Sequence, residues 1–162
     1  MTSRGETIVD VQLACDDPDT PDAEKIRDWV VSAIAAADVT AMDGFEVSIR
    51  VVDVDEIRTL NREYRDKDEP TNVLSFPAGE ITGMPERGGA VLGDVVICAS
   101  VVRDEAVEQG KALADHWGHM LVHGTLHLLG HDHMTDVEAT EMEGLEVRVL
   151  TSKGVADPYR AQ

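Results

Sequence analysis

The chain has 162 residues, enough for one domain with one hydrophobic core. Its formal net charge of −18 argues against a protein that wraps nucleic acid non-specifically, because phosphate binding relies on Lys and Arg side chains. No apolar run approaches the length that spans a bilayer, and residues 1–10 lack the basic and then apolar pattern of a signal peptide. We therefore expect a single domain over residues 1–162, located in the cytoplasm.

Alternating apolar residues predict two strands in the first third of the chain, over residues 7–15 and 45–52. Between them, an amphipathic helix is expected to begin after Thr20 as its cap, with Pro21 in the first turn. A strand, a helix and a strand in this order favour parallel pairing of the two strands.

The middle of the chain predicts one more helix and two more strands. The helix is capped by Asp53 or Asp55 and runs to about Tyr64. The strands are expected at residues 72–77 and 90–98, before and after a connection rich in glycine and proline.

The last third predicts three helices. The first is capped by Ser100 and ends near Gly110, the second spans residues 111–129, and the third follows a capping box of Thr135 and Glu138. The expected fold is therefore α+β, a single domain with a mixed four-stranded sheet packed with about five helices.

All six histidines lie between residues 116 and 133. His123 and His127 are four residues apart on the predicted helix, so both rings share one face and can bind the same ion. Gly130 permits a left-handed residue that reverses the chain and returns His133 to that face. Three imidazoles with a fourth position open predict a catalytic site for one zinc ion, with His123, His127 and His133 as its metal ligands.

The same histidine spacing occurs in metzincin proteases, which carry a glutamate directly after the first histidine. That glutamate is the general base of the protease reaction, and the residue in this chain is Gly124. A metal-dependent peptidase is therefore an alternative that keeps its metal ligands but lacks its base.

The remaining histidines leave several interpretations open. His119 lies one turn before His123 and is either a further ligand or a partner of a ligand. His116 and His131 are interpreted as bystanders. Asp132 either orients a ligand histidine through its second nitrogen or is a plain turn residue.

Residues 123–133, with the sequence HGTLHLLGHDH, resemble the signature of the YbeY family of rRNA maturation factors. Three further blocks match that family in the same order: residues 60–77, 92–97 and 116–120. Two positions depart from the family pattern, where His131 replaces the usual tyrosine and Asp66 replaces a glycine. Neither departure touches a predicted metal ligand.

The resemblance implies a zinc-dependent endoribonuclease, a hydrolase that cleaves phosphodiester bonds in single-stranded RNA. The implied role is maturation of the 3′ end of small-subunit (16S) rRNA and ribosome quality control. The implied partners are single-stranded rRNA and the ribosome or small-subunit proteins, with no membrane. The family's zinc ligands carry over to His123, His127 and His133, and its functional arginine carries over to Arg65.

A compact basic cluster supports a role for Arg65. Arg58, Arg62 and Arg65 fall on one helical stripe, with Lys67 close behind. A solvated helix face explains Arg58 and Arg62, whereas Arg65 can stabilise charge that develops on a phosphate. The other alternative is a non-enzymatic ribosome-assembly factor with a structural zinc, which would need no cation facing the metal.

Overall fold

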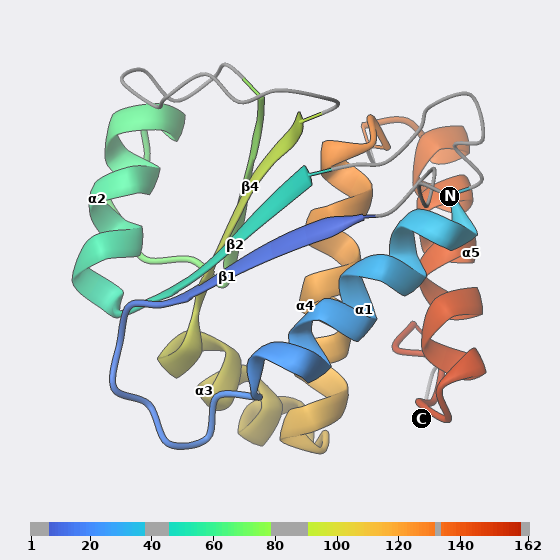
Figure 1. Ribbon diagram of the computed structural model, residues 1–162, viewed down its shortest axis with the longest axis horizontal. Helices are drawn as coiled ribbons and strands as arrows, with labels where there is room; N and C mark the ends of the chain where they lie inside the picture. Colours follow the sequence, from blue (N-terminus) through green and yellow to red (C-terminus); the bar gives the residue numbers. More distant parts are fainter. Residues whose placement is uncertain (1–6, 38–45, 79–90, 132–133, 160–162) are drawn as a thin grey trace, which may run out of the picture.

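The computed structural model describes residues 7–37, 46–78, 91–131 and 134–159. Four strands and five helices follow one another along these residues (Figure 1): β1 (Ile8–Leu13), α1 (Ala23–Ala36), β2 (Glu46–Val52), α2 (Val54–Arg65), β3 (Val73–Pro77), β4 (Val91–Cys98), α3 (Ala99–Gln109), α4 (Leu113–Leu128) and α5 (Asp136–Ser152). Within this described part of the chain, no helix is long and apolar enough to cross a membrane.

The four strands form one mixed sheet in the order β1-β2-β4-β3. β1 pairs with β2 and β2 with β4 in parallel, whereas β3 runs antiparallel to β4. The parallel pairing of β1 with β2 is the arrangement that a strand, helix and strand in sequence favour. The predicted α+β fold, with its mixed four-stranded sheet and five helices, is confirmed.

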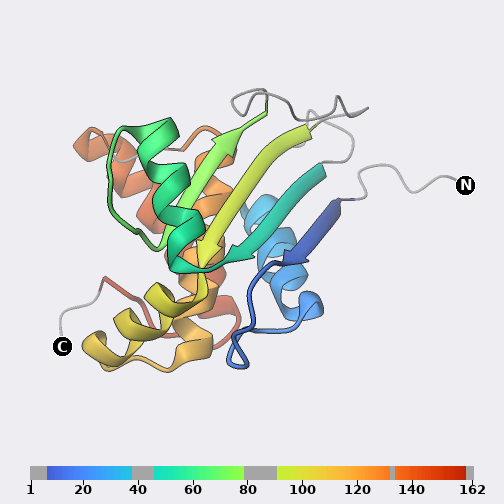
Figure 2. The same ribbon diagram turned by 90° about the vertical axis from the view of Figure 1, so that its left-hand side faces the viewer.

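Helices cover the two faces of the sheet unequally. α1 and α4 pack on one face, and α2 packs on the opposite face beside β4 (Figures 1 and 2). α5 contacts α1 and α4 and forms an outer layer away from the sheet. α4 therefore contacts strands on one side and α1, α3 and α5 on others, and it is the helix that carries most of the histidines.

The core between the sheet and α4 has the composition that the sequence pattern predicts. The inward residues of β2 and the apolar stripe of α4 are all at most 8% exposed: Val47, Ile49, Val51, Trp117, Leu121 and Leu128. Burial of that stripe fixes the rotation of α4 about its axis, because the apolar side must face the sheet and α1. The same rotation turns His123 and His127 away from the core.

Two of the predicted helix caps are wrong. α1 begins later than expected, because the Asp22 side chain accepts a hydrogen bond from the backbone N–H of Lys25 at 2.9 Å and Thr20 makes no cap. Ser100 lies inside α3, whose N-cap residue is Cys98 with no side-chain cap bond. β4 passes directly into α3, so no loop residue precedes the helix to serve as a cap.

The other predicted caps are confirmed. Asp53, and not Asp55, caps α2 by accepting from the N–H of Glu56. Thr135 caps α5 by accepting from the N–H of Glu138 at 3.1 Å. These short-range bonds set where α2 and α5 begin.

Candidate active site

A groove of about 550 Å³ opens between β3, the end of α2 and the C-terminal half of α4. Its walls contain Arg65, Asn72, Val73, Leu74, Ser75, Pro77, His123, His127, Gly130 and His131. The groove therefore brings together the predicted catalytic arginine and two of the three predicted metal ligands, although they are far apart in sequence.

The two ring nitrogens that face the groove converge. The Nε2 atoms of His123 and His127 lie 3.1 Å apart, one helical turn from each other on α4. Two nitrogen ligands of one tetrahedral zinc are about 3.3 Å apart, because each lies about 2.0–2.1 Å from the ion. The pair therefore fits two ligands of one metal ion. The third predicted ligand, His133, lies outside the described residues, as does Asp132.

The chain reverses at Gly130, as the sequence predicts. Gly130 has φ of 95°, and its N–H donates to the carbonyl of His127 at 3.1 Å. The N–H of His131 donates to the carbonyl of Leu126 at 3.1 Å, which completes a Schellman motif. The turn that would return residue 133 towards His127 thus begins directly after α4.

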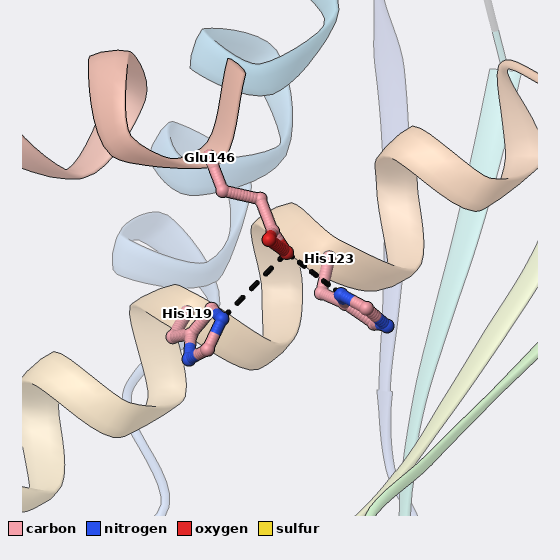
Figure 3. Close-up of side chains that lie close together, drawn as sticks. All are labelled: His119, His123 and Glu146. Carbon is pink, nitrogen blue, oxygen red and sulfur yellow. Dashed lines mark hydrogen bonds and ion pairs between the residues drawn. The ribbon is translucent and has the colours of Figure 1, made fainter. Parts of the chain in front are cut away.

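A buried carboxylate lies behind His123. Glu146 on α5 reaches between His119 and His123 on α4, as Figure 3 shows. Its Oε1 atom lies 2.7 Å from Nδ1 of His123 and 3.6 Å from Nε2 of His119. The hydroxyl of Tyr159 donates to the Oε2 atom of Glu146 at 2.5 Å. The carboxylate is fully buried and is held by three side chains.

These contacts change the acidity of both groups. Burial raises the pKa of Glu146, but the nearby His119 ring and the hydrogen bonds from His123 and Tyr159 outweigh burial and lower the pKa to about 2. Burial of the hydroxyl raises the pKa of Tyr159, and its bond to the Glu146 carboxylate raises that pKa further. At neutral pH, Glu146 is therefore a carboxylate and Tyr159 a neutral hydrogen-bond donor.

Glu146 also defines a second possible metal group. His119, His123 and Glu146 each offer a ligand atom, and these atoms lie within 4.8 Å of one another. His119 is a possible ligand in this group and also lies beside the candidate ligand His123, so the geometry fits both interpretations that its position in the sequence leaves open. His123 belongs to both groups, through Nδ1 towards Glu146 and through Nε2 towards His127.

Glu146 and Tyr159 were not among the residues that the sequence singled out. A signal for Glu146 is present, because a glutamate occupies the apolar stripe of α5 that Met142, Val149 and Leu150 define. A charged residue on a buried stripe indicates a partner, although the pattern does not say which one.

Gly124, the residue at the position of the metzincin base, faces the sheet. A Cβ atom there would lie 2.8 Å from Cγ1 of Val95 and 3.2 Å from Cγ2 of Val73. The carbonyl of Gly124 accepts a hydrogen bond from the hydroxyl of Ser75 at 2.9 Å, which ties α4 to β3. A glutamate at this position would collide with strands instead of entering the groove, so the protease mechanism has no base here.

Arg65 is held against the groove wall. Its guanidinium donates to the carbonyl of Ser75 at 2.8 Å and to the carbonyl of Tyr64 at 3.0 Å. The guanidinium carbon also lies 4.8 Å from the centre of the Phe76 ring. These contacts fix a positive charge on the same groove as His123 and His127.

The other arginines of the basic cluster are turned away. Arg58 pairs with Asp68 at 2.9 Å, and Arg62 lies 4.0 Å from the same carboxylate, all three side chains being about half exposed. The interpretation of Arg58 and Arg62 as a solvated helix face agrees with this geometry.

The two histidines interpreted as bystanders differ. His116 is buried away from the groove, with Nε2 2.9 Å from Oε1 of Glu105. Burial is the main cause of its lowered pKa. His131 lies on the groove wall beside Gly130, so it shares the groove with His123 and His127.

The fold, the groove and its histidines together define an α+β protein with a candidate metal site on an open groove. The YbeY family, described as endoribonuclease YbeY, matches residues 12–154. The chain therefore belongs to the YbeY family of endoribonucleases, and the expectation of an enzyme of the nuclease class is confirmed at the level of the family.

Relatives named endoribonuclease YbeY match along most of the chain. One from Alcanivorax borkumensis is 53% identical and covers 93% of this chain and 85% of its own length. One from Colwellia psychrerythraea is 44% identical, with 96% and 98% covered, and one from Halorhodospira halophila is 51% identical, with 86% and 88% covered. The solution structure of a Thermotoga maritima protein shares the fold at a TM-score of 0.55 and 21% identity, covering 95% of this chain and all of the other.

Proposed function

We propose that the whole chain, residues 1–162, is one zinc-dependent endoribonuclease domain that cleaves single-stranded RNA in its groove. The proposed role is maturation of the 3′ end of 16S rRNA and ribosome quality control in the cytoplasm. One observation carries the proposal. In a member of an endoribonuclease family, the Nε2 atoms of His123 and His127 converge to 3.1 Å on a groove that Arg65 also lines.

The proposed ligands of one zinc ion are His123, His127 and His133. The short distance between the two Nε2 atoms and the turn at Gly130 support this set. The alternative set uses Nδ1 of His123 with Glu146, but those two atoms lie only 2.7 Å apart, well short of the spacing of about 3.3 Å between two ligands of one tetrahedral zinc. A metal between them would need the two atoms to move apart, whereas the Nε2 pair, at 3.1 Å, already lies close to that spacing and faces the groove.

The chain's own residues supply positioning and charge. Held by the proposed histidine ligands, a zinc ion would supply Lewis acidity towards a phosphate group. Arg65 supplies a guanidinium whose planar donors suit phosphate oxygens. Because Ser75, Tyr64 and Phe76 already hold Arg65, it needs little reorganisation as negative charge develops on the phosphate.

The charge distribution of the protein favours a short contact with RNA and a basic protein partner. Arg65 is the one Lys or Arg side chain on the groove wall within the residues that the structure describes. With a net charge of −18, the protein gains little from long phosphate contacts. We therefore propose single-stranded rRNA as the substrate, with small-subunit ribosomal proteins as partners that help an acidic surface dock.

Arg65 also separates an enzyme from a non-enzymatic assembly factor. A structural zinc is enclosed by protein ligands and gains nothing from a cation across an open groove. The proposal is supported by the groove lining, which contains both the guanidinium of Arg65 and the histidine pair. This arrangement favours chemistry on an anionic substrate.

The test is cleavage of a single-stranded RNA by the purified protein, beside a duplex of the same sequence and beside casein. We expect cleavage of the single strand that stops with a chelator, returns with zinc and is absent in His127→Ala. Casein should stay intact. RNA cleavage that is insensitive to the chelator, or no RNA cleavage by the zinc-loaded protein, would contradict the proposal.

A further inference from the structure

The carboxylate of Glu146 is buried where a charge is costly. Its side chain is 1% exposed and lies on the apolar stripe of α5 beside Met142 and Leu150. A buried carboxylate destabilises a fold unless nearby groups pair with it. This one lies against His123, so its contacts bear directly on the candidate metal site.

The contact with Glu146 fixes the state of the His123 ring. Oε1 lies 2.7 Å from Nδ1, a distance at which Nδ1–H donates to the carboxylate. An imidazole with its proton on Nδ1 keeps the lone pair of Nε2, the nitrogen that lies 3.1 Å from Nε2 of His127. Glu146 thus selects the tautomer and the ring orientation that a metal ligand requires on the groove side.

Tyr159 in turn holds the carboxylate. Its hydroxyl donates to Oε2 of Glu146 at 2.5 Å and lies 3.1 Å from Nε2 of His119. Its ring meets the His119 ring edge-on, with centroids 5.4 Å apart. Tyr159 lies in the segment that follows α5, so the chain beyond the last helix folds back to reach the rear of the site.

We propose that Glu146 and Tyr159 are positioning residues of the metal site: Glu146 holds the His123 ring towards the groove, and Tyr159 holds Glu146. The inference rests on the proposed function, because it takes His123 and His127 as ligands through Nε2. In this arrangement the Glu146 carboxylate supports a metal ligand and does not bind the metal itself. The segment after α5, which carries Tyr159, is then part of the site.

The experiment measures zinc affinity by competition with a chromophoric chelator, at a temperature where each metal-free variant is folded. Glu146→Gln keeps size and an acceptor oxygen but loses the charge, and it should weaken zinc binding about 10- to 100-fold. Tyr159→Phe removes one hydroxyl and should weaken binding about two- to tenfold. Cobalt substitution should give the same absorption band in wild type and Glu146→Gln, because no ligand atom is lost.

Glu105→Gln is the matched control. Glu105 makes the same kind of contact with a buried histidine of α4, His116, about two turns from His123, and it also accepts from Nδ2 of Asn72 on the groove wall at 3.1 Å. Zinc affinity of this variant should stay within about twofold of wild type, since neither residue contacts a proposed ligand.

The possible outcomes separate this inference from the proposed function. If the wild-type protein binds no zinc, the proposed function and the positioning role are both overturned. If the wild-type protein binds zinc and Glu146→Gln binds it equally well, only the positioning role is overturned. A shifted cobalt band in Glu146→Gln would show that the carboxylate is a ligand, and this result also overturns the positioning role. If Glu146→Gln does not fold, Tyr159→Phe decides, and unchanged affinity in that variant counts against the inference.

Discussion

Two histidine–glutamate pairs lie about two turns apart on α4. His116 meets Glu105 of α3 at 2.9 Å, and His123 meets Glu146 of α5 at 2.7 Å. Each pair uses one ring nitrogen and one carboxylate oxygen, and each ties α4 to a neighbouring helix. As isolated contacts, the two pairs are chemically alike.

The two pairs differ in the surroundings of the second nitrogen of each histidine ring. Nδ1 of His116 is buried and has no hydrogen-bond partner among the described residues. Nε2 of His123 lies on the groove, 3.1 Å from Nε2 of His127. Pairing with a carboxylate is therefore no sign of a functional histidine by itself. The surroundings of the other nitrogen decide whether the pair supports the fold or a site.

The largest effect is expected when a proposed metal ligand is removed, compared with removal of the buried His116. His127→Ala should weaken zinc binding by more than about 100-fold, because losing a ligand costs more than losing its support, and RNA cleavage should be lost with the metal. His116→Ala should keep zinc but lower the free energy of unfolding by roughly 1–3 kcal/mol, since a buried hydrogen bond to Glu105 is lost while Glu105 keeps its contact with Asn72. Zinc titration and urea unfolding of both variants check this. Equal loss of zinc in both would remove the distinction.

The next largest effect is expected from substitution of Arg65, the positively charged side chain on the groove wall. Arg65→Ala should keep the fold and zinc but slow RNA cleavage about 10²–10³-fold, because a fixed donor to the developing charge is lost. Arg65→Lys should recover only part of the rate, since an ammonium lacks the planar donors. The measurement is single-turnover cleavage of one RNA at matched zinc content.

Arg58→Ala is the matched control for Arg65. Arg58 lies on the same helix as Arg65, and its side chain pairs with Asp68 in solvent. The cleavage rate of Arg58→Ala should stay close to wild type. Rates for Arg65→Ala within about threefold of this control would contradict the catalytic role, since that gap is below 1 kcal/mol.

A smaller effect is expected at the turn that follows α4. Gly130→Ala places a Cβ where no atom lies within 4 Å, so only the backbone conformation at φ of 95° is strained. That strain costs roughly 1–2 kcal/mol and would shift the chain leading to His133. Zinc affinity should fall about tenfold, as measured by chelator competition. Unchanged affinity would show that the turn does not depend on glycine.

Local patterns in the sequence predicted much of this molecule. The apolar stripe through Trp117 and Leu121 set the rotation of α4, and the spacing of His123 and His127 then placed both rings on one side. The reversal at Gly130 was predicted for the same reason, because a helix C-cap depends on a few adjacent residues.

Contacts between elements that are distant in the sequence could not be predicted from such local patterns. Glu146 lies 23 residues after His123, and nothing in the pattern of α5 names its partner. The cap at Thr20 was wrong because Asp22, two residues on, competes for the same helix start. Arg58, Arg62 and Arg65 share a stripe in sequence, yet only Arg65, in the last turn of α2, lines the groove within the described residues.

The proposed metal binds on the groove side of His123. Anomalous diffraction at the zinc absorption edge, from crystals of the zinc-loaded protein, tests this position most directly. We expect one peak about 2.0–2.1 Å from the Nε2 atoms of both His123 and His127. A peak between Nδ1 of His123, His119 and Glu146 would contradict it, because Glu146 would then be a ligand and the groove would hold no metal.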